Sequence, residues 1–295
     1  MTTLRYGDRS QAVRILQNNL NQRGVKLEAD GDFGEQTESA VRRWQLKTGL
    51  VADGIAGAKT LASLAGNPCQ QLLKNHDLAI AAQRLGVPLA SVYAVNEVES
   101  KGKGFLDSGK PVILFERHIM YRQLTKPRHE GDDPAQLQQH ADELAALNPA
   151  IVNPKPGGYA GGSAEHQRLS HARLIDDNAA LESASWGAFQ IMGFHWERLG
   201  YASVQSFVAA MSASESGQFD AFVRFIETDP ALHKALKARK WADFAKLYNG
   251  PDYRRNLYDA KLQRAFERHA NCDCVLEVTC CLLYTSDAAD EGLGV

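Results

Sequence analysis

Two similar turns within the first 65 residues constrain the fold of this chain more than any other feature of its sequence. The segments DGDFG (residues 30–34) and DGIAG (residues 53–57) lie 23 residues apart, and a threonine follows each of them. Asp-Gly pairs favour tight turns, because glycine reaches positive φ at little cost and aspartate can bond its own downstream backbone. Such a repeat of turn and helix predicts a small module whose repeats share one core.

The segments around these turns have helical periodicity. Val13, Leu16 and Leu20 recur at helical spacing after Ser10, a residue type that commonly caps a helix. A second helix is predicted over residues 37–47, with Trp44 among the apolar residues of its inner face. The first 65 residues are therefore expected to form a compact helical domain.

These residues also resemble a known family. YGDRSQAVRILQNNLNQRG (residues 6–24), followed by DGDFGEQTESAVRRWQLKTGLVADGIAGAKT (residues 30–60), is similar to the three-helix peptidoglycan-binding module that accompanies many cell-wall hydrolases. The resemblance covers nearly all of residues 4–64. It implies that residues 1–65 bind the cell wall, with Asp30, Phe33 and Trp44 as candidate wall-binding residues. Taken one at a time, the turn residues are equally explained by structure alone.

The rest of the chain reads as a linker and one larger helical domain. The linker is predicted over residues 66–74, where Asn67-Pro68 interrupts the helical pattern. The larger domain is predicted over residues 75–270. It has one short β-branched run at 111–115 and a long loop rich in Pro, Gly, Asp and His at 125–165. Helices are predicted over residues 77–85, 88–99, 166–181, 203–211, 217–227, 230–238, 241–247 and 253–268.

Residues 271–295 differ from everything before them. They hold four of the five cysteines (Cys272, Cys274, Cys280 and Cys281) and five acidic residues, with no Lys or Arg and no periodicity. No histidine lies among these cysteines, and their spacing fits no common zinc pattern. We interpret this segment as a tail that is not native to the protein and leave it out of the functional argument.

Composition excludes several function classes. The hydrophobic content of 44% and charged content of 23% are those of a soluble globular protein. No apolar run approaches the ~18 residues of a membrane-spanning helix, and the N-terminus lacks a secretory signal. No basic stripe indicates nucleic-acid binding. No zinc-ligand pair or phosphate-binding loop appears, and Cys69 lies in the linker, so we expect no metal or other cofactor.

Glu99 is the first candidate for catalysis. In LASVYAVNEVES (residues 89–100), Val92, Asn96 and Glu99 fall close to one helix face, whereas Glu97 is rotated about 200° from Glu99. Burial and the negative end of the helix dipole both raise the pKa of a carboxyl group in such a place. That is the environment of a general acid near neutral pH, although a solvated glutamate at a helix end is an equally ordinary interpretation.

Glu116 is the second candidate carboxylate. It follows the predicted strand in ILFERH (residues 113–118), next to Arg117, with which it could form a structural ion pair. An acid that ends a helix and an acid that ends a strand together make the two-carboxylate layout of glycoside hydrolysis. We expect Glu116 to open onto the same cleft as Glu99.

Two further segments carry polar residues that are candidates for substrate binding. SASWGAFQIMG (residues 183–193) contains Ser185 and Gln190, and YNGP (residues 248–251) contains Tyr248 and Asn249. Each segment alone is explained by packing, as a helix start and a helix C-cap. Their order after a helix-ending Glu-Ser is what makes them informative.

That order resembles the goose-type lysozyme and lytic-transglycosylase superfamily. VESKGKGF, ILFERH, GGYAGG, SASWGAFQIMG and YNGPDY are more closely similar to the N-acetylmuramidase domain of modular phage endolysins, over about residues 75–268. The resemblance implies a mainly α fold, with the three-helix wall-binding domain followed by a lysozyme-like α domain that has a short β element. It implies that Glu99 is the catalytic acid and that Ser185, Gln190, Tyr248 and Asn249 bind substrate. Glu116 has no secure counterpart in the wider superfamily.

The leading hypothesis is an endolysin, an N-acetylmuramidase (lysozyme) that cuts the β-1,4 bond after N-acetylmuramic acid in peptidoglycan. The goose-type resemblance favours inversion, for which the two carboxyl groups lie ~6.5–9.5 Å apart with room for a water. A lytic transglycosylase that forms 1,6-anhydro products and a non-catalytic wall-binding protein remain open. We expect a monomer that stays in the host cytoplasm until a holin releases it to the periplasm, although a secreted bacterial hydrolase is also possible.

Overall fold

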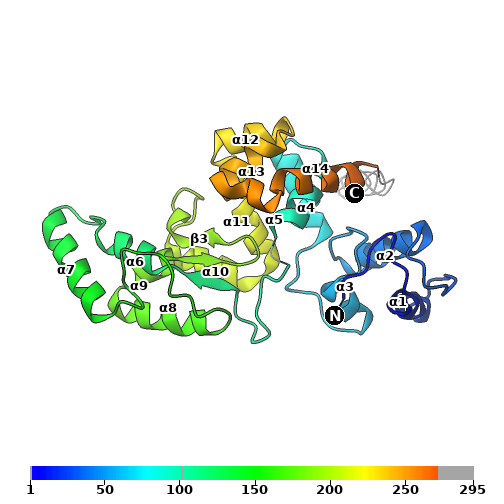
Figure 1. Cartoon of the computed structure of the whole chain (residues 1–295), viewed down its shortest axis with the longest axis horizontal. Coiled ribbons are helices and arrows are strands. Elements are labelled where there is room, and N and C mark those ends of the chain that lie inside the picture. The colour runs from blue at the N-terminus through cyan, green and yellow to red at the C-terminus, as the bar shows by residue number, and fades with distance from the viewer. Residues whose placement is uncertain (1, 101, 272–295) are drawn as a thin grey trace, which may run out of the picture. The chain divides into compact units, whose positions relative to one another are not determined.

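The computed structural model describes residues 2–100 and 102–271 (Figure 1). The predicted tail lies outside the described residues, except for Asn271. The described chain divides into two compact units, one formed by residues up to 98 and from 231 onward, the other by residues 99–230. The fold is mainly α with a small β element, which confirms the prediction for the fold class.

The N-terminal part of the first unit is a three-helix module, as predicted. It contains α1 (Gln11–Gln22), α2 (Glu35–Thr48) and α3 (Ala58–Leu64), and Ser10 caps α1 by accepting a hydrogen bond from the Val13 N–H. The apolar stripes of these helices meet in one core, because each helix is too short to be stable without burying its apolar face. The core residues are Leu4, Val13, Leu16, Leu20, Phe33, Ala40, Val41, Trp44, Ala56 and Leu64.

Both turns of the internal repeat are built in the same way. In the first, the Gln17 side-chain amide donates to Asp30 Oδ1 at 2.8 Å and to Thr37 Oγ1 at 3.0 Å, and its carbonyl accepts from the Gly31 N–H. Thr37 lies inside α2 and Thr60 inside α3, and each accepts a hydrogen bond from the glutamine that holds its turn. The second turn repeats the arrangement with its own glutamine, aspartate and threonine: Gln45, Asp53 and Thr60 (2.8 and 3.1 Å).

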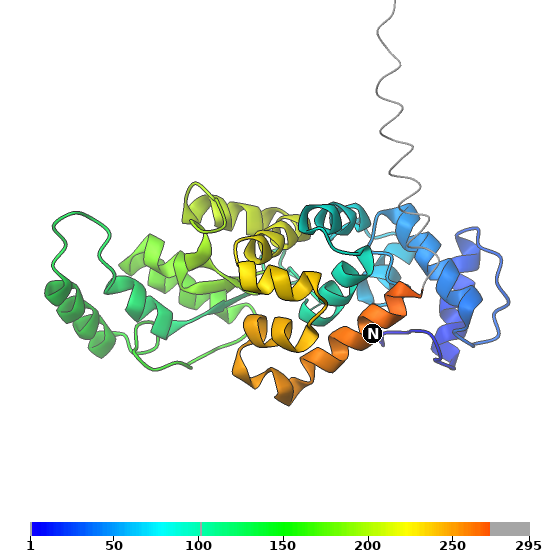
Figure 2. The same ribbon diagram turned by 90° about the horizontal axis from the view of Figure 1, so that it is seen from above.

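The rest of the first unit is a group of helices from both ends of the second predicted domain. It comprises α4 (Asn75–Leu85), α5 (Leu89–Glu99, which ends at the boundary of the units), α12 (Pro230–Lys237), α13 (Trp241–Asn249), the 3-10 helix η2 (Pro251–Asn256) and α14 (Tyr258–Ala270). In Figures 1 and 2 the yellow to orange helices α12–α14 lie beside the cyan α4 and α5. His233 bonds the carbonyl of Leu85 at 2.7 Å, and the Tyr93 ring stacks on His269.

The second unit is built around a three-stranded antiparallel sheet in the order β1-β2-β3. Its strands are β1 (Ile113–Phe115), β2 (Ala184–Trp186) and β3 (Ile191–Met192), with Leu114 opposite Ser185. Helices α8 and α9 contact the sheet. The helices of this unit are α6 (Arg117–Leu124), α7 (Pro134–Leu147), α8 (Ala164–Ile175), α9 (Asp177–Glu182), η1 (Gly193–His195), α10 (Val204–Ala213) and α11 (Glu215–Glu227).

Some elements differ from the sequence predictions. The predicted loop 125–165 contains α7, which Asp133 caps and in which only Ala141 is buried, so it has no apolar stripe to detect. The predicted helix 166–181 is two helices, because Asp176 ends α8 and its side chain caps α9. Residues 183–193 form a β-hairpin and not a helix start.

No single helix in the described part of the chain has the length and apolar character to cross a membrane. Helices α4 and α5 satisfy that criterion only when taken together, and they meet at an angle of 116°.

Candidate functional site

Glu99 is the last residue of α5 and is only 7% exposed. It follows Val92 and Val95 at helical spacing, and both valines are buried, so the face that carries Glu99 is an apolar one. The structure thus places this carboxyl group at a helix C-terminus with little access to water. Both features are those expected of a general acid.

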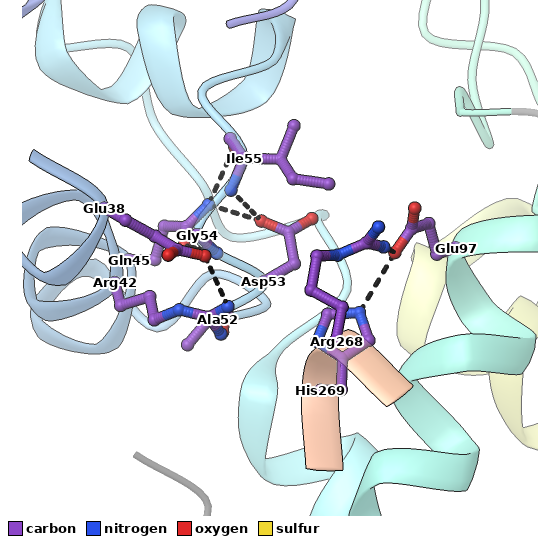
Figure 3. Close-up of polar contacts among 10 residues, drawn as sticks. All are labelled: Glu38, Arg42, Gln45, Ala52, Asp53, Gly54, Ile55, Glu97, Arg268 and His269. Atoms are coloured by element: carbon purple, nitrogen blue, oxygen red, sulfur yellow. Dashed lines mark hydrogen bonds and ion pairs between the residues drawn. The ribbon is translucent and has the colours of Figure 1, made fainter. Parts of the chain in front are cut away.

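Glu97, two residues earlier, lies in different surroundings. It forms an ion pair with Arg268, and its Oε2 lies 3.0 Å from His269 Nε2 (Figure 3). Burial by itself would raise the pKa of Glu97, but the hydrogen bonds and charges of His269 and Arg268 outweigh it and lower that pKa. A carboxylate whose pKa is lowered by hydrogen bonds and by a paired arginine is suited to a structural role and not to donating a proton.

The loop after Glu99 is held by two buried side chains of α11. The Gly104 N–H donates to Glu215 Oε1 at 3.0 Å, and its carbonyl accepts from the Gln218 amide at 3.1 Å. Gln218 also accepts from the Ala188 N–H at 2.9 Å, in the turn between β2 and β3. A Cβ on Gly104 would overlap Gln218 Oε1, so only glycine fits there. The clamp ties the loop that follows Glu99 to the turn that precedes Gln190.

Ser185 and Gln190 are brought together by this hairpin. The Ser185 hydroxyl donates to Gln190 Oε1 at 3.0 Å, and the Gln190 amide donates to the Gly187 carbonyl at 2.8 Å. Gln190 has a φ of 52°, a left-handed conformation that is strained for a residue other than glycine. Backbone strain of this kind, fixed by side-chain hydrogen bonds, is common at functional sites.

Glu116 lies on the same side of the sheet as Ser185. Side chains alternate along extended backbone, so Glu116 shares the face of Leu114, which pairs with Ser185. Its Oε2 accepts a hydrogen bond from the Tyr159 hydroxyl at 2.8 Å and lies 3.2 Å from His118 Nδ1. Arg117 instead donates to three backbone carbonyls of residues 149–156. The ion pair between Glu116 and Arg117, considered from the sequence, is not formed.

Tyr248 and Asn249 belong to the first unit, where they end α13. Both are partly exposed, and the Tyr248 ring stacks on the buried Phe244 with 6.1 Å between centroids. Among the predicted site residues, the hydrogen bond described above joins Ser185 to Gln190.

The candidate wall-binding residues differ in exposure. Phe33 is fully buried and Trp44 nearly so, with the Trp44 indole N–H donating to Ser63 Oγ at 2.8 Å. Such buried side chains support the core of the module, and their contact with the wall stays a prediction. Asp30 lies at the surface, where hydrogen bonds from the Asp32 N–H and then Gln17 lower its pKa.

Several residues of this region were not found from the sequence. Tyr159 and His118 contact Glu116, and Glu165, Glu215 and Gln218 anchor nearby loops from inside the fold. The GGYAGG motif was a signal for Tyr159, but nothing local marks a buried glutamate as a loop anchor. Among the described residues, no group of three or more His, Cys, Asp or Glu side chains could hold a metal ion.

Comparisons with known proteins identify the families that the two parts of the chain match. Residues 88–270, more than half of the chain, match the family model of the N-acetylmuramidases, and residues 9–64 match that of the peptidoglycan binding domain. The crystal structure of a Burkholderia AP3 phage endolysin is similar, with 52% identity, a TM-score of 0.84, and coverage of 92% of this chain and 100% of that one.

A curated relative matches the N-terminal module alone. A zinc D-Ala-D-Ala carboxypeptidase of Streptomyces albus G is 46% identical over 61 residues, which span 20% of this chain and 24% of that protein.

The match over residues 88–270 confirms the predicted family, and its range includes Glu99, Glu116 and the hairpin of Ser185 and Gln190. The chain belongs to the N-acetylmuramidase family.

Proposed function

We propose that this protein is a peptidoglycan hydrolase of the endolysin type that cuts the β-1,4 bond between N-acetylmuramic acid and N-acetylglucosamine. The observation that carries the proposal is the buried Glu99 at the end of α5, inside the segment that matches the N-acetylmuramidases. The likeness to a phage endolysin over most of the chain supports it. We take residues 75–270 as the catalytic domain.

In the proposed reaction Glu99 donates its proton to the glycosidic oxygen while the bond to the anomeric carbon breaks. A water attacks that carbon from the opposite face, and Glu116 accepts the proton that the water loses. The products are a chain ending in a reducing N-acetylmuramic acid and a chain with a free 4-hydroxyl. The proton on Glu116 returns to Glu99 through solvent. Ser185, Gln190, Tyr248 and Asn249 bind the sugars in this scheme.

The N-terminal module is proposed to hold the enzyme on insoluble peptidoglycan. Its match to the peptidoglycan binding domain supports this, and Asp30 is the one candidate wall-binding residue at the surface. We further propose that the protein acts as a monomer and reaches the wall from the host cytoplasm through a holin, as befits the likeness to a phage endolysin.

Glu99→Gln tests the proposal on purified peptidoglycan. We expect a folded protein whose rate falls at least ~100-fold, since general acid catalysis contributes ~10²–10⁴-fold. Glu97→Gln is the matched control and should keep most of its rate per folded molecule. Loss in the Glu97 variant with retention in the Glu99 variant would contradict the choice of acid.

Mass spectrometry of the products separates the alternatives. Hydrolysis releases reducing muropeptides, whereas a lytic transglycosylase, in which the substrate's own 6-hydroxyl attacks, releases 1,6-anhydro products that are one water lighter. A wild-type protein that binds sacculi but releases nothing would be a non-catalytic wall-binding protein.

A further inference from the structure

Three consecutive residues hold the glycine-rich loop of residues 149–162: Phe115 at the end of β1, and Glu116 and Arg117 at the start of α6. The Phe115 N–H donates to Glu165 at 3.1 Å, and the same carboxylate accepts from the N–H groups of Ala160 and Gly161. Glu116 accepts from Tyr159, and Arg117 donates to the carbonyls of residues 149, 155 and 156 at 3.0–3.1 Å. The loop is therefore fixed to the sheet on both sides of Tyr159.

The anchor beneath this loop is a buried, hydrogen-bonded ion pair. Glu165 is fully buried and pairs with Arg168 at 2.8 Å, and Arg168 also donates to the Phe115 carbonyl at 2.9 Å. Gly158, next to Tyr159, has a φ of +74°, and a Cβ there would press on the Arg117 guanidinium. A backbone held in this way gives the Tyr159 hydroxyl one position relative to Glu116.

Both polar neighbours of the Glu116 carboxylate lie beside the same oxygen. Tyr159 and His118 contact Oε2, and within the part of the chain that the structure describes no hydrogen bond or ion pair reaches Oε1. Burial and the hydrogen bond to Glu116 raise the pKa of the Tyr159 hydroxyl, so it stays protonated and donates. One oxygen is held while the other is left for a water or a sugar hydroxyl.

We propose that Tyr159 is a positioning residue for Glu116. Its hydroxyl holds Oε2 so that Oε1 alone is presented to the attacking water. This rests on the proposed function, in which Glu116 accepts the proton of that water. The titratable and charged groups around Glu116 are His118 on α6, Arg117 with its guanidinium on the loop carbonyls, and the Glu165–Arg168 pair on α8. The Tyr159 side chain is 48% exposed, so removing its hydroxyl disturbs no core.

Tyr159→Phe in the full chain tests the proposal. We expect kcat to fall about tenfold with KM nearly unchanged. The loss should fall on kcat, because in the proposal Tyr159 orients Glu116 toward the attacking water and does not itself bind the sugar. The matched control is Tyr121→Phe, which removes another tyrosine hydroxyl that donates to a carboxylate, Asp142, at 2.6 Å. That variant should keep the wild-type kcat and KM.

A second measurement does not depend on activity. The melting temperature of Tyr159→Phe should stay near that of wild type, because Tyr159 lies at the surface and its hydroxyl supports no core contact. An unchanged kcat would overturn the positioning role, and so would a loss of kcat that comes with an equal rise in KM or with a fall in melting temperature.

Glu116→Gln distinguishes the failures. If that variant is as active as wild type, the role of Glu116 in the proposed function is wrong, and the positioning role fails with it. If Glu116→Gln is inactive while Tyr159→Phe behaves as wild type, only the inference about Tyr159 fails.

Discussion

Burial fixes the charge state of His195, which lies in η1 beside the rings of Phe194 and Phe225. The apolar surroundings, and then the positive charge of Arg198, lower its pKa from 6.5 to about 4. The unfolded chain takes up this proton at higher pH than the folded protein does. Folding stability is therefore lost as the pH falls from 6.5 through about 4, and is fully present above that range.

His195→Gln removes this titration. We expect the melting temperature of the variant to fall less than that of wild type between about pH 7 and about pH 4.5, because the imidazole no longer has to stay neutral. His171→Gln, at an exposed position on α8, is the control and should follow the wild-type curve. Calorimetry across this range checks the prediction, and parallel curves for all three proteins would contradict it.

At the scale of elements, the two turns of the N-terminal module hold the same kind of aspartate side chain in two different environments. Asp30 and Asp53 accept the same hydrogen bonds from a glutamine and a backbone N–H. Hydrogen bonds lower the pKa of Asp30 at the surface, whereas burial raises that of Asp53 and outweighs its hydrogen bonds from Ile55 and Gln45. Figure 3 shows Asp53 facing Arg268 and Glu97. The charge on the aspartate therefore stabilises the first turn and costs stability in the second.

Asn in place of each aspartate separates these effects, since asparagine keeps the accepting oxygen. We expect Asp30→Asn to lower the melting temperature near pH 7 and Asp53→Asn to lower it less or to raise it. The stabilisation by Asp30 is lost as the pH falls through its lowered pKa, and the cost of Asp53 grows as the pH rises through its raised pKa. The difference between the variants should therefore shrink toward about pH 3. Thermal melts at both pH values check this, and an equal loss in both variants near neutral pH would contradict it.

At the scale of the whole molecule, two matched regions are joined in one chain. Residues 9–64 match the peptidoglycan binding domain, and residues 88–270 match the N-acetylmuramidases. A module that holds the polymer raises the local concentration of substrate for a linked enzyme without any new contact at the active site. Binding to insoluble wall and turnover of soluble chains should therefore be separable.

Deletion of residues 2–66 tests this separation. Sedimentation with insoluble sacculi should weaken, while the rate on soluble glycan fragments should stay near that of the full chain. A circular-dichroism melt of the deletion variant serves as the control for folding. A truncated protein that pelleted with sacculi as well as the full chain would disprove wall binding by the module.

The sequence by itself determined the features that depend on neighbours along the chain. Helical spacing of apolar residues predicted the three-helix module, and Asp-Gly pairs predicted its turns, because backbone preference and side-chain periodicity act over a few residues. Glu99 and Glu97 were separated by rotation about one helix, which is again local geometry. The order of short motifs was enough for the family.

Tertiary structure alone decided which distant residues meet. Tyr159 reaches Glu116 across 43 positions and Gln218 reaches Gly104 across 114, and no local pattern encodes either contact. Helix α7 was not predicted because Ala141 is its only buried residue, so its sequence shows no apolar stripe. The spacing of apolar residues reflects which side chains a segment buries, so it does not predict a helix that buries little. It also does not predict the contact of a polar side chain whose partner lies on another element.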